Sequence, residues 1–208
     1  MEWWRRHLKT FIANQYQQLF MSSAGTNMDE VLACVQNKVS QSINDNLAVP
    51  FTGDEVWRAL KDMGDLKAPG SDGITVIFYK RFWNLVGDKV KEEVLQVLNG
   101  AHMPAGRNDT VIVLIPKTAS PDKLKDLRPI SLCNVVYKIT SKVLANRLKV
   151  VLPKVISLSQ SAFVPRRLIT DNVLLAYELT HYLNQRRKGK NGVMAIKLDM
   201  SKAYDRVE

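Results

Sequence analysis

The residues Ala195-Ile-Lys-Leu-Asp-Met-Ser-Lys-Ala-Tyr-Asp-Arg-Val-Glu208 place a carboxylate at the end of a short apolar run. The run predicts a strand over residues 193–198 that ends at Asp199. Tyr204 follows five residues later, and Asp205 comes directly after it. An aspartate at the end of a strand is a common ligand of a divalent metal, and a two-metal site needs at least one further acid. The local sequence alone favours, by about two to one, the alternative that Asp199 caps a following helix.

Positive charge is concentrated in the second half of the chain, which has 208 residues and a net charge of +10. Residues 1–103 carry 11 Lys+Arg and 12 Asp+Glu, whereas residues 104–208 carry 19 Lys+Arg and 8 Asp+Glu. This asymmetry favours a polyanionic partner for the second half. A solvated basic surface without a partner explains the charge equally well.

The composition is that of a globular protein, because 46% of the residues are hydrophobic. No apolar run reaches the roughly 18 residues of a membrane-spanning helix, so we expect no membrane association. The first residues, Met1-Glu-Trp-Trp-Arg-Arg-His7, lack the apolar segment of a secretory signal. Cys34 and Cys133 lie far apart without metal-ligand spacing, which favours an intracellular, reducing compartment, either nucleus or cytoplasm.

Hydrophobic periodicity predicts helices in the first half of the chain. Thr52-Gly-Asp-Glu55 has the pattern of a capping box and predicts the start of one of them. Pro69, Gly70 and Gly73 predict a tight loop in which the two glycines permit positive φ. The predicted helices cover residues 3–20, 28–47, 53–63, 75–86 and 88–99.

Residues 110–115 form a continuous β-branched run, which predicts a buried strand. Residues 128–132 are expected to return as a second extended segment, so that the two make a hairpin with basic residues at its base. Asn134 is placed to cap a long helix that continues to Val151. A further helix is predicted over residues 171–185.

Five motifs follow one another in a particular order along the chain. They are Lys67-Ala-Pro-Gly-Ser-Asp-Gly73, Leu114-Ile-Pro-Lys117, Arg128-Pro-Ile-Ser-Leu-Cys-Asn134, Gln160-Ser-Ala-Phe-Val-Pro165 and Lys197-Leu-Asp-Met-Ser-Lys-Ala-Tyr-Asp205. The ordered set resembles the reverse transcriptase domain of plant non-LTR (LINE-type) retrotransposons, from about Phe20 onward. Each motif alone is weak, whereas five in order are specific.

The resemblance implies an α+β fold that comprises the fingers and the beginning of the palm of a right-hand polymerase. Residues 51–208 would form this truncated domain, which reaches only to the first catalytic motif. Residues 1–50 would form a helical N-terminal extension.

The resemblance also implies roles for single residues. Asp199 resembles the first of the polymerase carboxylates that hold two Mg²⁺ ions, with the backbone carbonyl of Met200 as a further ligand. Tyr204 resembles a steric gate that selects a deoxyribose over a ribose. Lys117 and Arg128 match positions that bind the phosphates of the incoming dNTP. Without the resemblance, Tyr204 reads as a core aromatic and the two cations as surface charges.

The segment that begins at Gln160 resembles the part of the family that lies along the template strand. The candidate nucleic-acid contacts are Gln160, Phe163, Pro165 and Arg167, together with the phosphate-tracking lysines Lys138, Lys142 and Lys149. Arg166 stands where the family usually has glycine, and Ser71 where it usually has proline. A glycine at the first position often serves positive φ or a close backbone approach.

The implied parent reaction is RNA-directed DNA synthesis, in which a primer 3′-hydroxyl attacks a dNTP on an RNA template with Mg²⁺ as cofactor. The family's second acidic motif has no counterpart in residues 1–208, so we expect this chain to be inactive alone. Two alternatives remain open. The chain is a non-catalytic basic module that binds RNA or DNA, or it is an inert remnant of a retroelement.

Overall fold

The computed structural model describes residues 2–22, 28–100, 102–186 and 193–199. Contacts divide the chain into two units, Met1–Asn37 with Leu168–Glu208, and Lys38–Arg167. The first unit contains α1 (Glu2–Phe20), α2 (Met28–Ala33) and α8 (Ile169–Gln185). The second contains α3 (Gln41–Ala48), α4 (Gly53–Lys61), α5 (Val76–Arg81), α6 (Trp83–Leu98), β1 (Val111–Pro116), a 3-10 turn (Leu124–Asp126), β2 (Leu127–Leu132) and α7 (Val135–Val155).

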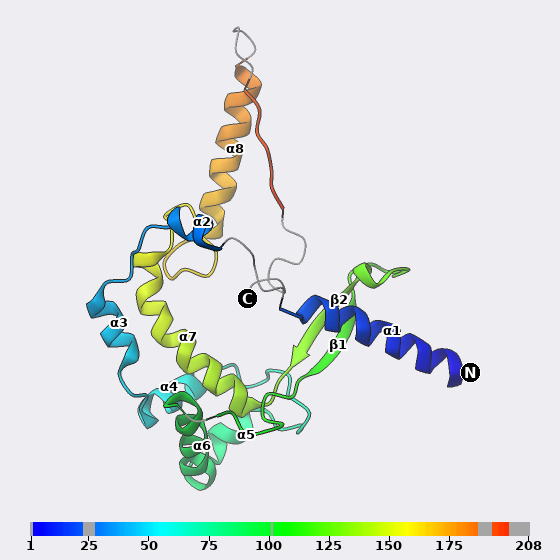
Figure 1. Ribbon diagram of the computed structural model, residues 1–208, viewed down its shortest axis with the longest axis vertical. Helices are drawn as coiled ribbons and strands as arrows, with labels where there is room; N and C mark the ends of the chain where they lie inside the picture. Colours follow the sequence, from blue (N-terminus) through cyan, green and yellow to red (C-terminus); the bar gives the residue numbers. More distant parts are fainter. Residues whose placement is uncertain (1, 23–27, 101, 187–192, 200–208) are drawn as a thin grey trace. The chain divides into compact units, whose positions relative to one another are not determined.

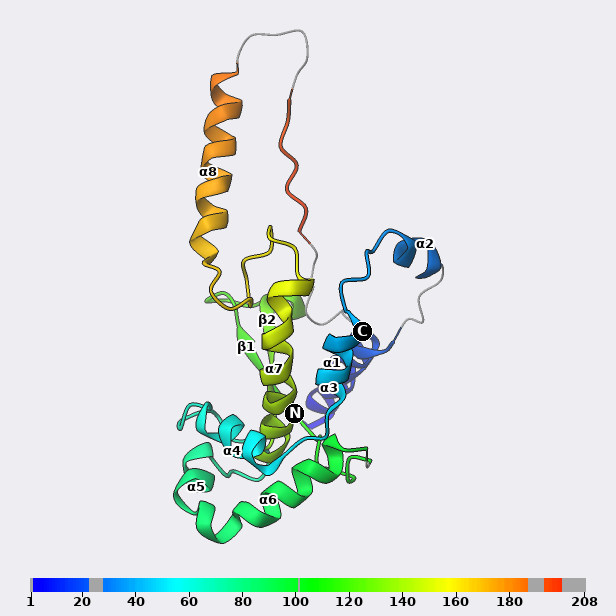
Figure 2. The ribbon, with the colours of Figure 1, turned by 90° about the vertical axis from the view of Figure 1, so that its left-hand side faces the viewer.

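The core of the second unit forms where α4, α5 and α6 pack around one end of α7 (Figure 2). Helical spacing explains this packing, because residues three or four positions apart share a face. The helix α4 buries Val56, Ala59 and Leu60, and α7 buries Val135, Ile139, Thr140 and Val143. Each buried Val or Leu contributes about 1.5–3 kcal/mol relative to an exposed one.

The predicted start of α4 is confirmed. The Glu55 carboxylate accepts hydrogen bonds from the backbone N–H of Thr52, at 2.9 Å, and from its hydroxyl, at 3.2 Å. The same carboxylate receives Arg147 of α7 through two parallel bonds of 2.7 and 2.9 Å. The Arg147 guanidinium also donates to the carbonyls of Leu47, Val49 and Pro50 and lies 3.5 Å from the ring centre of Phe51. One arginine thus joins α7 to the segment between α3 and α4.

The loop Lys67–Gly73 confirms one predicted glycine and corrects the other. Gly73 has φ of +70°, as expected for a tight turn. Gly70 is not among the glycines with positive φ. A Cβ on Gly70 would lie 2.6 Å from the carbonyl carbon of Cys133 and closer still to Asn134. Gly70 is therefore required because the loop packs directly on the backbone at the start of α7.

The strands β1 and β2 form an antiparallel hairpin with Val111 opposite Leu132 and Pro116 opposite Leu127 (Figure 1). The hairpin is confirmed, but the prediction that its first strand is buried is wrong. Val111, Ile112, Val113 and Ile115 are 39–47% exposed. A two-stranded ribbon has a partner on only one edge and no second layer among the described residues, so its β-branched side chains stay accessible.

Two other sequence predictions also need correction. Residues 28–47 form two helices, α2 and α3, because the hydroxyl of Ser40 accepts a hydrogen bond from the N–H of Ile43 and starts a new helix. Residues 193–199 are not assigned to a strand. A strand needs a hydrogen-bonded neighbour, and the described part of the chain offers none to this segment. The described residues are mostly helical with one hairpin, consistent with part of the expected α+β domain.

Candidate nucleotide and nucleic-acid site

The hairpin places the two candidate phosphate ligands on one face. Arg128 lies opposite Ile115, and the backbone N–H of Lys117 donates to the carbonyl of Asp126 at 2.8 Å, which continues the same register. Opposite residues share a face and successive residues alternate, so extending the register by one pair beyond Pro116 and Leu127 puts Lys117 and Arg128 diagonally on one face. Both side chains are exposed. The adjoining Pro116 and Pro129 restrict the backbone beside each cation.

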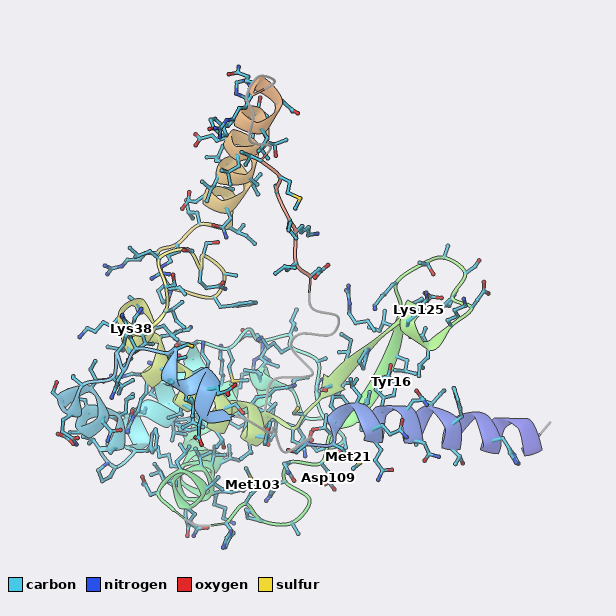
Figure 3. The ribbon with its side chains drawn as sticks, turned by 45° about the horizontal axis from the view of Figure 1, so that its top comes forward. Tyr16, Met21, Lys38, Met103, Asp109 and Lys125 are labelled. Atoms are coloured by element: carbon cyan, nitrogen blue, oxygen red, sulfur yellow. The ribbon has the colours of Figure 1, made fainter. Side chains whose placement is uncertain are left out.

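The two cations differ in their present contacts. The Lys117 ammonium donates to the carbonyl of Lys125 at 2.9 Å, and Lys125 lies at the turn end of the hairpin (Figure 3). Within the described ranges, no hydrogen bond or ion pair occupies the guanidinium of Arg128. A guanidinium can grip two phosphate oxygens at once, so Arg128 is the better placed of the two for an incoming anion.

The base of the hairpin is fixed by the loop Lys67–Gly73. The side-chain oxygen of Asn134 lies 3.4 Å from the backbone N–H of Asp72 and 3.4 Å from the hydroxyl of Ser71. The ammonium of Lys138 donates to the carbonyl of Ala68 at 2.6 Å. The predicted helix start at Asn134 is confirmed, but its side chain holds the loop and makes no cap to its own helix. These contacts join two of the sequence motifs in space.

Three lysines of α7 form one stripe, because Lys138, Lys142 and Lys149 are four and seven residues apart. Partial burial lowers the pKa of Lys142, and the charge of the neighbouring Lys149 lowers it further. The charge of Lys67 acts in the same direction, and only Asp62 opposes them. The stripe therefore concentrates positive charge that a phosphate oxygen would stabilise.

The candidate template segment is a braced loop. The Arg167 guanidinium donates to the carbonyls of Ile156, Ser157 and Gln160, so this predicted contact residue serves the loop in the structure. The amide of Gln160 donates to the carbonyl of Ala162 at 3.2 Å. Phe163 and Pro165, by contrast, are exposed.

Arg166 has φ of +68°. The expectation that this position takes a glycine-like backbone is thus met by an arginine. Ser161 and Val164 are the residues of this loop that turn inward.

The candidate metal site is described only in part. Asp199 is exposed, whereas Met200, Tyr204 and Asp205 lie outside the described residues. No group of three or more His, Cys, Asp and Glu side chains gathers among the residues that the structure describes. A carboxylate oxygen suits Mg²⁺, but one carboxylate is less than the donor set that this ion requires. The described residues therefore do not by themselves make the site.

Sequence reasoning missed Arg147, although it makes more hydrogen bonds than any predicted site residue. Its partner Glu55 is 92 residues away, and no local signal identifies such a pair. It also missed the contact between Asn134 and the loop at Gly70. The two glycines in that loop were a signal that something approaches its backbone closely.

Comparison with known proteins identifies the kind of domain. Residues 115–208 match the family described as reverse transcriptase (RNA-dependent DNA polymerase). These residues include the end of β1, all of β2 and α7, the braced loop and Asp199. They are part of a reverse transcriptase domain of the non-LTR retrotransposon type.

The chain is similar to proteins of mobile elements. It is 37% identical over 170 residues to the "Transposon TX1 uncharacterized 149 kDa protein" of Xenopus laevis, covering 82% of this chain and 13% of the relative. It is 27% identical to a Pol polyprotein from the type-1 retrotransposable element R2 of Nasonia vitripennis, covering 78% of this chain and 15% of the relative. The R2 polyprotein of Popillia japonica is 29% identical, covering 76% of this chain and 21% of the relative. The chain thus spans between one eighth and about one fifth of their lengths.

No helix in the described part of the chain is long and apolar enough to cross a membrane.

Proposed function

We propose that this chain supplies the nucleotide- and template-binding front part of a reverse transcriptase that copies RNA into DNA. The observation that carries the proposal is the shared face of Lys117 and Arg128 on the β1–β2 hairpin. Two cations on one face, neither of them in an ion pair among the described residues, match the charge of a polyphosphate. The fingers, and the beginning of the palm, are the parts of the polymerase that we assign to residues 51–208.

The remaining roles belong to the same proposal. Asp199 and the carbonyl of Met200 would hold Mg²⁺, which when bound supplies positive charge at the reacting phosphates. Tyr204 would exclude a ribose 2′-hydroxyl by its bulk. The chain's own contribution is to bind and orient the nucleotide, because phosphoryl transfer depends mostly on positioning and electrostatic stabilisation. Substrates would be an RNA template, a DNA primer and dNTP inside the cell, in an element of plant type.

The test is an Arg128→Lys substitution in the enzyme that carries this chain within its full length. We expect the KM for dNTP to rise about tenfold while kcat changes less, since a bidentate grip becomes a single point contact. Arg81→Lys, an exposed arginine of α5, is the matched control and should leave the KM unchanged. An unchanged KM in the Arg128 variant would contradict the assignment.

A second candidate function rests on the lysine stripe of α7. Burial lowers the pKa of Lys142, and the charge of Lys149 lowers it further, so a polyanion bound along the stripe would favour the charged lysine even without catalysis. In that case the 208-residue chain binds RNA with an affinity that falls steeply with salt, and it extends no primer. Template-dependent incorporation of dNTP by the purified chain would exclude this second function.

A further inference from the structure

Phe163 is presented to solvent in an unusual way. Its side chain is 95% exposed, and its backbone has φ of +63°. Single exposed apolar residues are common and need no explanation. A bulky residue in the left-handed region is rare, however, because its Cβ approaches the following carbonyl. An unfavourable backbone conformation that turns an aromatic ring outward is a feature that calls for a ligand.

The loop that carries the ring is held from within. Ser161 and Val164 are buried on either side of Phe163. The Arg167 guanidinium gathers the carbonyls of Ile156, Ser157 and Gln160, and the N–H of Arg167 donates to the carbonyl of Val164 at 3.3 Å. The loop backbone that carries the ring is therefore held before any ligand arrives, which reduces the entropy lost on binding.

A cation follows the ring three residues later in the same loop. Arg166 also has positive φ, its side chain is exposed, and no hydrogen bond or ion pair engages its guanidinium among the described residues. An exposed aromatic ring and an unpaired guanidinium in one loop match single-stranded nucleic acid, in which a base offers a flat face and its phosphate offers charge. A paired base in a duplex has both faces covered by its neighbours, so it cannot stack on this ring.

We propose that Phe163 stacks on an unpaired base of a single-stranded nucleic acid while Arg166 binds the adjoining phosphate. The inference rests on the proposed function, and it adds the contact mode and the preference for a single strand. A protein surface that covers the loop is the competing occupant. Leu158 distinguishes this occupant from nucleic acid, because it is 89% exposed in the same loop but has no aromatic ring to stack on a base.

The experiment measures fluorescence anisotropy of a short unstructured RNA, and of the same RNA paired with its complement, titrated with the purified chain at several salt concentrations. Phe163→Ala should weaken single-strand binding about tenfold with an unchanged salt dependence. Phe163→Trp should restore the affinity. Arg166→Ala should lower the slope of log affinity against log salt by about 0.7, the value for one phosphate contact to a single strand. Leu158→Ala should bind as the unchanged chain does. Because Phe163 is exposed, circular dichroism should show the same fold in each variant.

The outcomes distinguish a failure of the proposed function from a failure of the stacking contact. If the unchanged chain binds no RNA, both the proposed function and this inference are wrong. If it binds RNA but Phe163→Ala binds equally well, or loses duplex and single strand alike, only the stacking contact is refuted. Equal losses in Leu158→Ala and Phe163→Ala would overturn the inference in favour of an apolar docking surface.

Discussion

The helices α7 and α8 differ in how they use their apolar residues. The helix α7 buries Val135, Ile139 and Val143 in a core with α4 and α6, whereas no residue of α8 is buried. Apart from the half-buried Leu183, the large apolar residues of α8 are 53–71% exposed. Periodicity predicted both helices, so a periodic pattern establishes a helix without establishing what covers it. Most helical stability in proteins comes from the packing of an apolar face, which α7 has and which the described residues do not supply to α8.

The largest expected effect tests this contrast directly with a matched pair of leucines. Leu60 of α4 is fully buried, and Leu174 of α8 is 62% exposed. Leu60→Ala should lower the free energy of unfolding by about 2–5 kcal/mol, because it removes buried methylenes and leaves a cavity. Leu174→Ala should change it by no more than about 0.5 kcal/mol. Urea unfolding followed by the fluorescence of Trp57 and Trp83, which stack at 4.7 Å beside the core, measures both. A loss above about 1 kcal/mol in the Leu174 variant would show that α8 is covered in solution.

The next largest effect is expected at Arg147, which joins α7 to the segment between α3 and α4. Arg147→Ala should lower the free energy of unfolding by about 3 kcal/mol, because Glu55 loses a bidentate partner in a partly buried position. The carbonyls of Leu47, Val49 and Pro50 lose their donor at the same time. Lys91→Ala is the control, since its partner Asp88 is exposed and such pairs contribute about 0–1 kcal/mol. If the two substitutions had equal effects, Arg147 would stabilise the protein no more than an exposed ion pair does.

The ion pair between Arg147 and Glu55 makes the stability of the second unit sensitive to acid. The hydrogen bonds from Arg147 hold the pKa of Glu55 below its ordinary value of 4.5, against the opposing effect of burial. The unfolded chain therefore takes up this proton more readily than the folded one. The stabilisation is complete above the unfolded value and decreases as the pH falls through the folded value, below 4.5. In urea unfolding at a series of pH values, the stability difference between the unchanged chain and Glu55→Gln should shrink below this point. A difference that stays constant with pH would contradict the assignment.

The sequence could predict some parts of the molecule but not others. Local signals were sufficient for the cap at Thr52, the hairpin and the start of α7 at Asn134, because each depends on neighbours within a few residues. They failed for the burial of β1 and for the strand expected before Asp199, since both depend on a second layer or a pairing strand. The shared face of Lys117 and Arg128 follows from register, which a predicted hairpin leaves undetermined until its turn is known.

The smallest effect is expected at Arg166, in the last loop of the second unit. The backbone is strained at this residue, and the contacts of Arg167 hold the loop in that conformation. Arg166 has φ of +68°, a region in which glycine avoids the clash between Cβ and the following carbonyl. Arg166→Gly removes that clash but gives the unfolded chain more freedom, so the net gain in the free energy of unfolding should be only about 0.5–1 kcal/mol. Leu158→Gly is the matched control, because Leu158 is also exposed in this loop but is not among the residues with positive φ. It should be neutral or destabilising by a similar amount. If both glycine variants lower the stability, the left-handed backbone at Arg166 is not adopted in solution. If only Arg166→Gly raises it, the loop maintains a conformation that its own sequence disfavours, as expected for a surface shaped for a ligand.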